Sequence, residues 1–133
     1  MEWNLLADRP VYLQLMEQIQ ADIVSGSFQP GDKLPSVRDL ASEAGVNPNT
    51  MQRAMTELER SGLIFAQRTS GRYITTDEAL ITQLKEKSAM QQAEAFLDRM
   101  EQLGFQGEQT IELLKTLLHK RERTSTEEVV NNE

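Results

Sequence analysis

Hydrophobic side chains recur every three or four positions over residues 10–25, in PVYLQLMEQIQADIVS. This i, i+3, i+4, i+7 spacing is typical of one face of a helix. The stripe consists of Tyr12, Leu15, Met16, Ile19 and Ile23. Gly26 and the Pro/Gly-rich SFQPGDKLP that follows predict the end of this helix and a connector.

A second, shorter helix is expected to start at Ser36. Ser36 and Asp39 have the S-x-x-[DE] spacing of a helix N-terminal cap. The hydrophobic stripe then continues through Val37, Leu40, Ala41 and Ala44. Gly45 is expected to end this helix after about two turns.

The segment GVNPNTMQRAMTELERSG, residues 45–62, predicts a third helix with a sharply defined start. Asn47 is a good N-cap, and Pro48 occupies the first helical position, where a missing N–H costs nothing. The inward face is predicted to consist of Met51, Ala54, Met55 and Leu58. The outward face, with the same helical spacing, consists of Asn49, Gln52, Arg53 and Thr56.

Two short strands are expected over residues 63–67 and 72–76, separated by RTSG, which is typical of a hairpin turn. Two strands alone are marginally stable, so the hairpin must pack on the helices. Three short helices followed by a hairpin form a winged helix-turn-helix, a mainly α fold with a small β-hairpin. We expect a shared core of Ile19, Ile23, Leu40, Ala44, Val46, Met55 and Leu58.

Helical patterning returns over residues 77–103 and 108–121, with a break at GFQG. The last residues contain no hydrophobic stripe and are expected to be disordered. The chain is therefore divided into a winged helix-turn-helix domain over 1–76, a two-helix region over 77–121, and a tail over 122–133.

The composition of the chain argues against several classes of protein. The 133 residues include no cysteine and one histidine, and they contain no phosphate-binding loop or carboxylate–histidine cluster, so we expect neither an enzyme nor a metal or cofactor. No apolar run is long enough to cross a membrane and no signal peptide precedes MEWNLLADRP, so a cytoplasmic protein is expected.

The net charge of -7 argues against a nucleic-acid partner at first sight. Its distribution weakens that argument. Residues 1–76 hold 7 Lys and Arg against 9 Asp and Glu, a net of -2, whereas residues 77–133 hold 7 against 12, a net of -5. Because screening hides remote charge, a local basic face decides whether phosphate is bound.

The runs PGDKLPSVRDLA and GVNPNTMQRAMTELERSG, with SGRYI in the hairpin, resemble the GntR family of bacterial transcription regulators, in its YtrA-like subgroup. The resemblance extends over about residues 10–64 and the hairpin. It implies a repressor whose second helix, recognition helix and wing contact operator DNA. Carried over position by position, the implied DNA-binding residues are Ser36, Arg38, Asn49, Thr50, Gln52, Arg53, Arg68, Gly71 and Arg72.

This chain departs from the family pattern in the wing and in the recognition helix. The family wing usually reads Gly-x-Gly, and here Thr69 replaces the first glycine. Pro48 and Gln52 stand where other subgroups have arginine, which implies a different operator sequence and a weaker hold on phosphate. Arg38 has an alternative partner on its own helix, Asp39 or Glu43. Lys33 is expected to be a solvated charge.

One recognition helix and one wing make few contacts, so a homodimer on a palindromic operator is expected. The hydrophobic residues of the C-terminal helices would form its interface, or else fold back on the winged domain of the same chain. The candidate interface is Leu84, Phe96, Leu97, Met100, Ile111, Leu114 and Leu118.

Two questions stay open at this stage. About 45 residues in two helices can hardly enclose a ligand cavity of roughly 300–1,000 Å³, yet a small effector at a dimer interface or between the halves is not excluded. A winged helix can also serve as a protein–protein interaction module without specific DNA binding, and the acidic composition is compatible with that alternative.

Overall fold

The computed structural model describes residues 2–131, with side chains described as far as residue 125. The chain divides into two compact units, Met1–Lys87 and Ser88–Glu133. No helix within residues 2–131 is long and apolar enough to cross a membrane. The first unit holds three helices, a hairpin and the start of a fourth helix, and the second is almost entirely helical.

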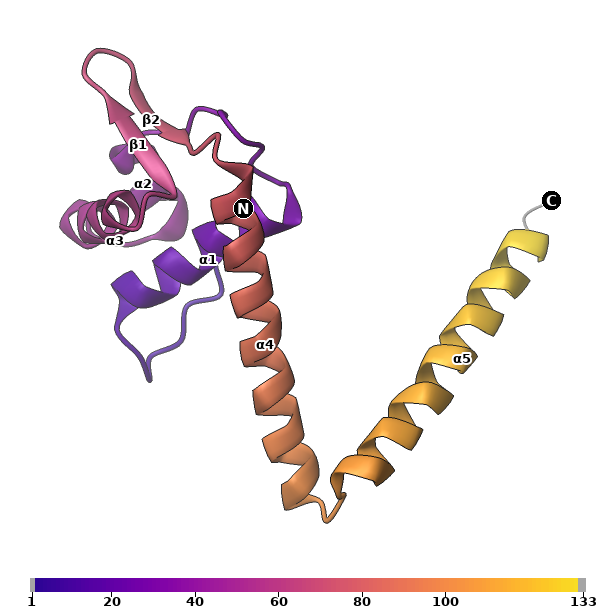
Figure 1. Cartoon of the computed structure of the whole chain (residues 1–133). Coiled ribbons are helices and arrows are strands. Elements are labelled where there is room, and N and C mark those ends of the chain that lie inside the picture. The colour runs from indigo at the N-terminus through magenta and orange to yellow at the C-terminus, as the bar shows by residue number, and fades with distance from the viewer. Residues whose placement is uncertain (1, 132–133) are drawn as a thin grey trace. The chain divides into compact units, whose positions relative to one another are not determined.

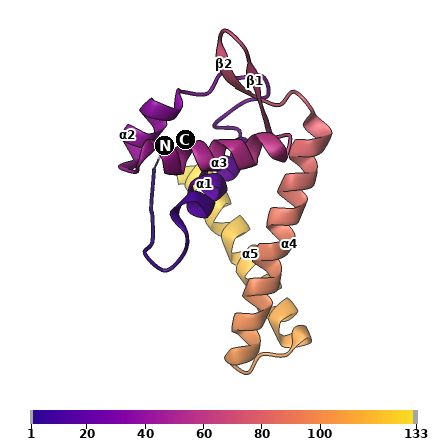
Figure 2. The same ribbon diagram turned by 90° about the vertical axis from the view of Figure 1, so that its left-hand side faces the viewer.

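Three helices pack around one core in the first unit: α1 (Val11–Ser25), α2 (Val37–Ala44) and α3 (Pro48–Arg60). Figures 1 and 2 show them grouped under the hairpin. The predicted core is confirmed, because five of its members are buried and Ala44 and Val46 pack against them. The buried members are Ile19, Ile23, Leu40, Met55 and Leu58.

The hairpin consists of β1 (Ile64–Gln67) and β2 (Gly71–Ile74), paired antiparallel with Phe65 opposite Tyr73. Both strands are slightly shorter than expected. Gly71 is the first residue of β2 rather than the tip of the turn, and its φ of 114° explains why glycine is needed there. Ile64 and Ile74 face each other and are buried, which attaches the hairpin to the core.

The connector between α1 and α2 adds a third strand-like segment beside β2. Leu34 donates its N–H to the carbonyl of Arg72 at 2.8 Å, and Ile74 donates to Asp32 at 2.8 Å. Lys33 thereby pairs with Tyr73. The hairpin is therefore supported by backbone bonds on its β2 edge as well as by the helices.

The segment before α1 is fastened to that helix by Gln14, a buried side chain. Its amide accepts the N–H of Leu6 at 2.6 Å and donates to the carbonyls of Leu6 and Arg9 at 2.7 and 2.9 Å. The Arg9–Glu17 ion pair adds to this attachment, and its hydrogen bond raises the pKa of Arg9 above the ordinary value. Trp3 is partly buried and packs against the core.

Two long helices follow the hairpin, α4 (Glu78–Gln102) and α5 (Gly107–Asn131). The start of α4 packs on the winged core through Leu80, Ile81 and Leu84. Leu84 was expected at a dimer interface, and the structure supports the alternative for this residue, a contact within its own chain.

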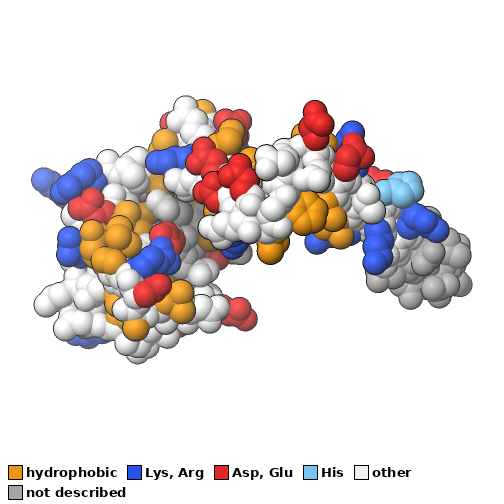
Figure 3. Space-filling model, turned by 90° about the horizontal axis from the view of Figure 1, so that it is seen from below, with side chains coloured by type: hydrophobic (Ala, Val, Ile, Leu, Met, Phe, Trp, Pro, Cys, Tyr) orange, Lys and Arg blue, Asp and Glu red, His pale blue; other side chains and the backbone are white. Residues whose placement is uncertain are grey.

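The second unit has a small core of its own. Among its described residues only Met100 and Thr110 are buried, at 7% and 1% exposure, beside the turn where Gly104 takes a φ of 90°. Met100 is therefore largely covered within its own unit. Large hydrophobic side chains stay exposed on both helices and on the turn between them, as Figure 3 shows on one face. They are Met90, Leu97, Leu103, Phe105, Ile111, Leu113, Leu114, Leu117 and Leu118.

The end of α5 differs from the expectation of a tail over 122–133. The helix continues to Asn131, ten residues beyond the predicted end at 121. Neither proline nor glycine occurs after Gly107, so nothing in this segment interrupts the backbone hydrogen bonds of a helix. A hydrophobic stripe locates the packed part of a helix and does not mark where the helix stops.

Candidate nucleic-acid interface

The recognition helix α3 begins as its sequence predicts. The Asn47 side chain accepts the N–H of Asn49 at 2.8 Å, and Pro48 follows at the first position. Met51, Ala54, Met55 and Leu58 face the core. The opposite face is exposed and presents Asn49, Gln52, Arg53 and Thr56 together.

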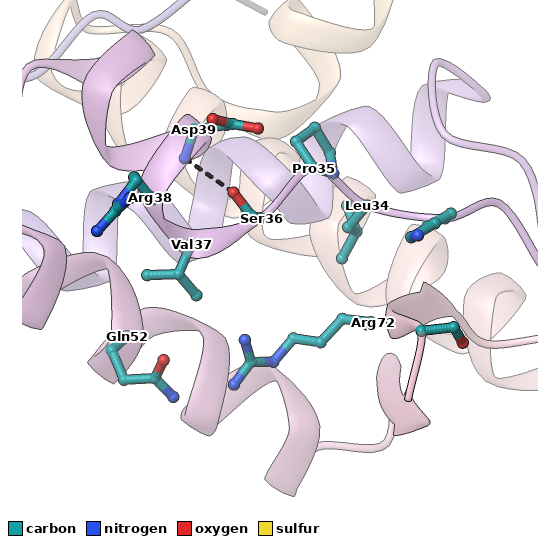
Figure 4. Close-up of a pocket in the computed structure, with 11 residues that line it drawn as sticks. Leu34, Pro35, Ser36, Val37, Arg38, Asp39, Gln52 and Arg72 are labelled. Atoms are coloured by element: carbon teal, nitrogen blue, oxygen red, sulfur yellow. Dashed lines mark hydrogen bonds between the residues drawn. The ribbon is translucent and has the colours of Figure 1, made fainter. Parts of the chain in front are cut away.

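A groove lies between α2 and the hairpin, which we call the wing, and we name it the α2–wing groove (Figure 4). It is open to solvent and has a volume of about 850 Å³. Five of the predicted DNA-binding residues line it: Ser36, Arg38, Gln52, Gly71 and Arg72. Residues from three separate elements therefore converge on one surface.

The start of α2 forms one wall of this groove. Ser36 accepts the N–H of Asp39 at 3.1 Å, so its hydroxyl caps the helix and keeps its own hydrogen free to donate. Arg38 is exposed, and no carboxylate of the described residues pairs with it. The alternative of an ion pair with Asp39 or Glu43 therefore has no support in the structure.

Arg72 reaches from β2 toward α3 in Figure 4. Its Nε donates to the carboxylate of Glu59 on α3, and both side chains are partly buried. The positive charge that we expected from Arg72 is therefore offset in the free protein. The same ion pair ties the wing to the recognition helix.

Lys33, which was expected to be a solvated charge, is exposed and lines the open α2–wing groove. Its Cε sits 3.4 Å from the position that a Cβ on Gly71 would occupy. The pairing of Lys33 with Tyr73 places it there. The spacing of hydrophobic residues cannot predict the contact of Lys33 with the hairpin, because the connector between α1 and α2 forms no helix or strand of its own.

A second groove lies between the start of α1 and α3, and we name it the α1–α3 groove. It has a volume of about 590 Å³ and is lined by Pro10, Val11, Tyr12, Asn49, Thr50 and Arg53. The guanidinium carbon of Arg53 lies 3.7 Å from the centre of the Tyr12 ring. Sequence reasoning assigned Tyr12 to the core stripe alone and missed this contact.

The remaining predicted residue, Arg68, lies in the wing turn, outside both grooves. It is exposed. The turn is held by Ser70, which receives a hydrogen bond from the Tyr73 hydroxyl at 2.9 Å, while Tyr73 stacks on Phe65 with ring centres 5.7 Å apart. Arg68 is thus presented by an ordered turn.

The surface around α3, formed by the two grooves and the wing turn, carries positive charges that the net charge of the whole chain conceals. Lys33, Arg38, Arg53 and Arg68 have no ion pair with any described residue, although the whole chain is acidic. An exposed helix with amide and guanidinium groups fits the major groove of B-form DNA, which admits one helix. The described residues include no cluster that could hold a metal ion.

Comparison with known proteins supports a DNA-binding role for the surface around α3. The model of bacterial regulatory proteins of the gntR family matches residues 11–74. The HTH-type transcriptional regulator YhcF of Bacillus subtilis is 38% identical over 116 residues, which are 87% of this chain and 96% of YhcF. The HTH-type transcriptional repressor YtrA of the same organism is 42% identical over 84 residues, 59% of this chain and 65% of YtrA.

A solved structure agrees with these relatives. The GntR family transcriptional regulator from Listeria monocytogenes is 40% identical, with a TM-score of 0.78 over 84% of this chain and 98% of its own. These similar proteins are regulators and not enzymes. The chain therefore belongs to the GntR family of DNA-binding transcriptional regulators, within its YtrA-like subgroup.

Proposed function

We propose that the protein is a repressor that binds a palindromic operator as a homodimer. The observation that carries the proposal is the convergence of α2, α3 and the wing on the α2–wing groove, where Arg38 and Gln52 are exposed together. The similar protein YtrA is named a repressor, which supports the same sign of regulation here. By analogy with the family, the regulated genes would be those of a transporter operon.

Each contact of the proposed interface has a distinct role. The N-terminal residues of α3, Asn49 and Gln52, carry amides that can pair with base edges, so they would read sequence. Ser36 and Arg53 would contact phosphate and fix the register. Gly71 lets the wing backbone approach the minor groove closely, with Arg68 beside it.

The homodimer is proposed from the exposed hydrophobic side chains of the second unit. The unit has 46 residues, and those whose side chains are described bury only two, which is too small a core to account for its stability. Its many exposed leucines indicate a partner surface. Of the predicted interface residues, Phe96 is partly buried, while Leu97, Ile111, Leu114 and Leu118 are exposed at 36–59%. A two-fold pair would present two recognition helices to half-sites about one helical turn apart.

Selection of bound duplexes from a random pool tests activity, symmetry and spacing together. The native protein is expected to enrich one inverted repeat. Arg38→Ala is expected to lose most of the affinity for the selected duplex, because an unpaired, exposed guanidinium is removed. The matched control is Arg60→Ala, since Arg60 is exposed and pairs with Glu57 at the other end of α3. Retained affinity in Arg38→Ala would contradict the assigned role.

Ionic strength separates the proposal from a protein–protein interaction module. A dimer with four unpaired cations in each winged unit makes about six to ten phosphate contacts, so affinity should fall by about 10³–10⁵ between 50 and 200 mM salt. An apolar protein contact has no such dependence. A flat salt response, with no enriched duplex, would favour the interaction module.

A further inference from the structure

Arg53 and Tyr12 come from different helices and meet at the edge of the α1–α3 groove. The guanidinium carbon lies over the ring, 3.7 Å from its centre, so the guanidinium is in contact with the ring face. Arg53 is exposed, whereas Tyr12 is half-buried and packs against the core on its other side. The ring is thus a fixed surface and the arginine is the mobile partner.

We infer that Tyr12 is a positioning residue for DNA binding, which holds Arg53 in the conformation that contacts an operator phosphate. The inference rests on the proposed function and extends it to a residue outside the helix-turn-helix. A free arginine side chain samples many rotamers, and binding phosphate requires one of them. Stacking on an aromatic face orders the guanidinium before DNA arrives.

The stacked geometry leaves the N–H groups available. The donors of a guanidinium lie in its plane and point outward from its edge, so a ring below the plane uses none of them. No carboxylate of residues 2–125 pairs with Arg53, and Asn49 and Thr50 line the same groove. The side chain therefore keeps both its charge and its donors while its direction is fixed.

The test compares two substitutions at position 12 in the full-length protein. Tyr12→Phe keeps the aromatic face and is expected to bind the selected duplex as the native protein does. Tyr12→Leu keeps an apolar side chain on the core and removes the face, so affinity is expected to fall about two- to five-fold. Because phosphate carries no sequence, the same loss is expected on an unrelated duplex. Thermal unfolding without DNA shows whether either variant has lost stability.

A double-mutant cycle with Arg53→Gln shows whether the effect passes through Arg53. With glutamine at position 53, Tyr12→Leu should cause no further loss. An equal loss in both backgrounds, or no loss with arginine present, would overturn the inference. If the native protein itself bound no duplex, the proposed function would be contradicted before this inference is tested.

NMR tests the contact between Arg53 and Tyr12 without DNA. Ring currents should shift the Arg53 side-chain protons upfield in the native protein and in Tyr12→Phe, and not in Tyr12→Leu.

Discussion

Arginine side chains of the winged unit differ in whether a carboxylate already holds them. Arg60 and Arg72 are paired with glutamates of α3, whereas Arg38 and Arg68 are not paired with any described residue. An unpaired cation can bind phosphate without first giving up a partner. The Arg60–Glu57 pair spans three residues of one helix, so sequence spacing allows it, whereas the Arg72–Glu59 pair joins β2 to α3 and depends on the packed fold.

The residue most constrained by backbone geometry is Gly71. Its φ of 114° is disfavoured for any side chain, and an added Cβ would meet the Lys33 Cε at 3.4 Å. Gly71→Ala is therefore expected to lower the free energy of unfolding by about 1–3 kcal/mol. The thermal or denaturant midpoint measures this loss, and the affinity for the selected duplex should fall with it because the wing is displaced.

Gly107→Ala is the matched control. Gly107 is the first residue of α5, has no positive φ, and has open space where a Cβ would lie. Alanine is the better helix former, so the midpoint should stay the same or rise slightly. Equal destabilisation by the two substitutions would contradict the role assigned to the backbone at Gly71.

At the scale of single residues, hydrogen bonds between near neighbours in the sequence could be predicted, and contacts between distant residues could not. The caps at Ser36 and Asn47 form as expected, because each uses an N–H two or three residues away. The Arg72–Glu59 pair and the Tyr12–Arg53 stack join separate elements and depend on the packed fold. Tyr12 fits the hydrophobic stripe of its helix whether or not it contacts Arg53, so the sequence pattern does not predict that contact.

At the scale of elements, the start of α3 decides where the recognition residues point. The Asn47 side chain accepts an N–H that the helix cannot satisfy itself. Asn47→Ala should lower the free energy of unfolding by about 1 kcal/mol. Asn47→Ser restores an oxygen acceptor and should recover most of the loss, which denaturant titration of both variants would show. No difference between alanine and serine would mean that the cap is dispensable.

The helices of the winged unit agree with prediction more closely than its strands do. A helical stripe bounded by a cap and a glycine identifies both ends of α2 and α3. The hairpin strands are shorter than predicted because the ends of a strand depend on its pairing partners. One partner is the connector at Lys33, whose sequence shows no strand pattern. The end of α5 was misplaced for the related reason that a helix can continue beyond the end of its hydrophobic stripe.

At the scale of the whole molecule, the winged unit and the C-terminal helices differ in how completely each buries its hydrophobic residues. The winged unit encloses thirteen buried hydrophobic residues in one cluster, whereas the described part of the second unit buries Met100 alone among its hydrophobic side chains. Stability of the first unit is thus supplied within the chain. The second unit leaves most of its described hydrophobic side chains exposed, which supports the proposal that a second copy of the chain covers them.

Leu114→Glu tests that proposal directly. Leu114 is 36% exposed on α5, and its neighbours Ile111 and Leu118 on the same helix face are more exposed still. A glutamate at position 114 would be an unpaired charge buried in the proposed interface, which is strongly unfavourable. Size-exclusion chromatography with light scattering should therefore show the native protein at twice the mass of the variant.

Leu13→Glu is the control, because Leu13 has a closely similar exposure of 38% but lies on α1 in the winged unit. It should leave the dimer intact. Loss of the dimer should also weaken binding to the full palindrome far more than to a single half-site, because the second recognition helix is then no longer held near its half-site. A monomeric native protein, or a dimeric Leu114→Glu variant, would remove the exposed leucines of α5 from the interface. The hydrophobic surface of the second unit would then need a different partner.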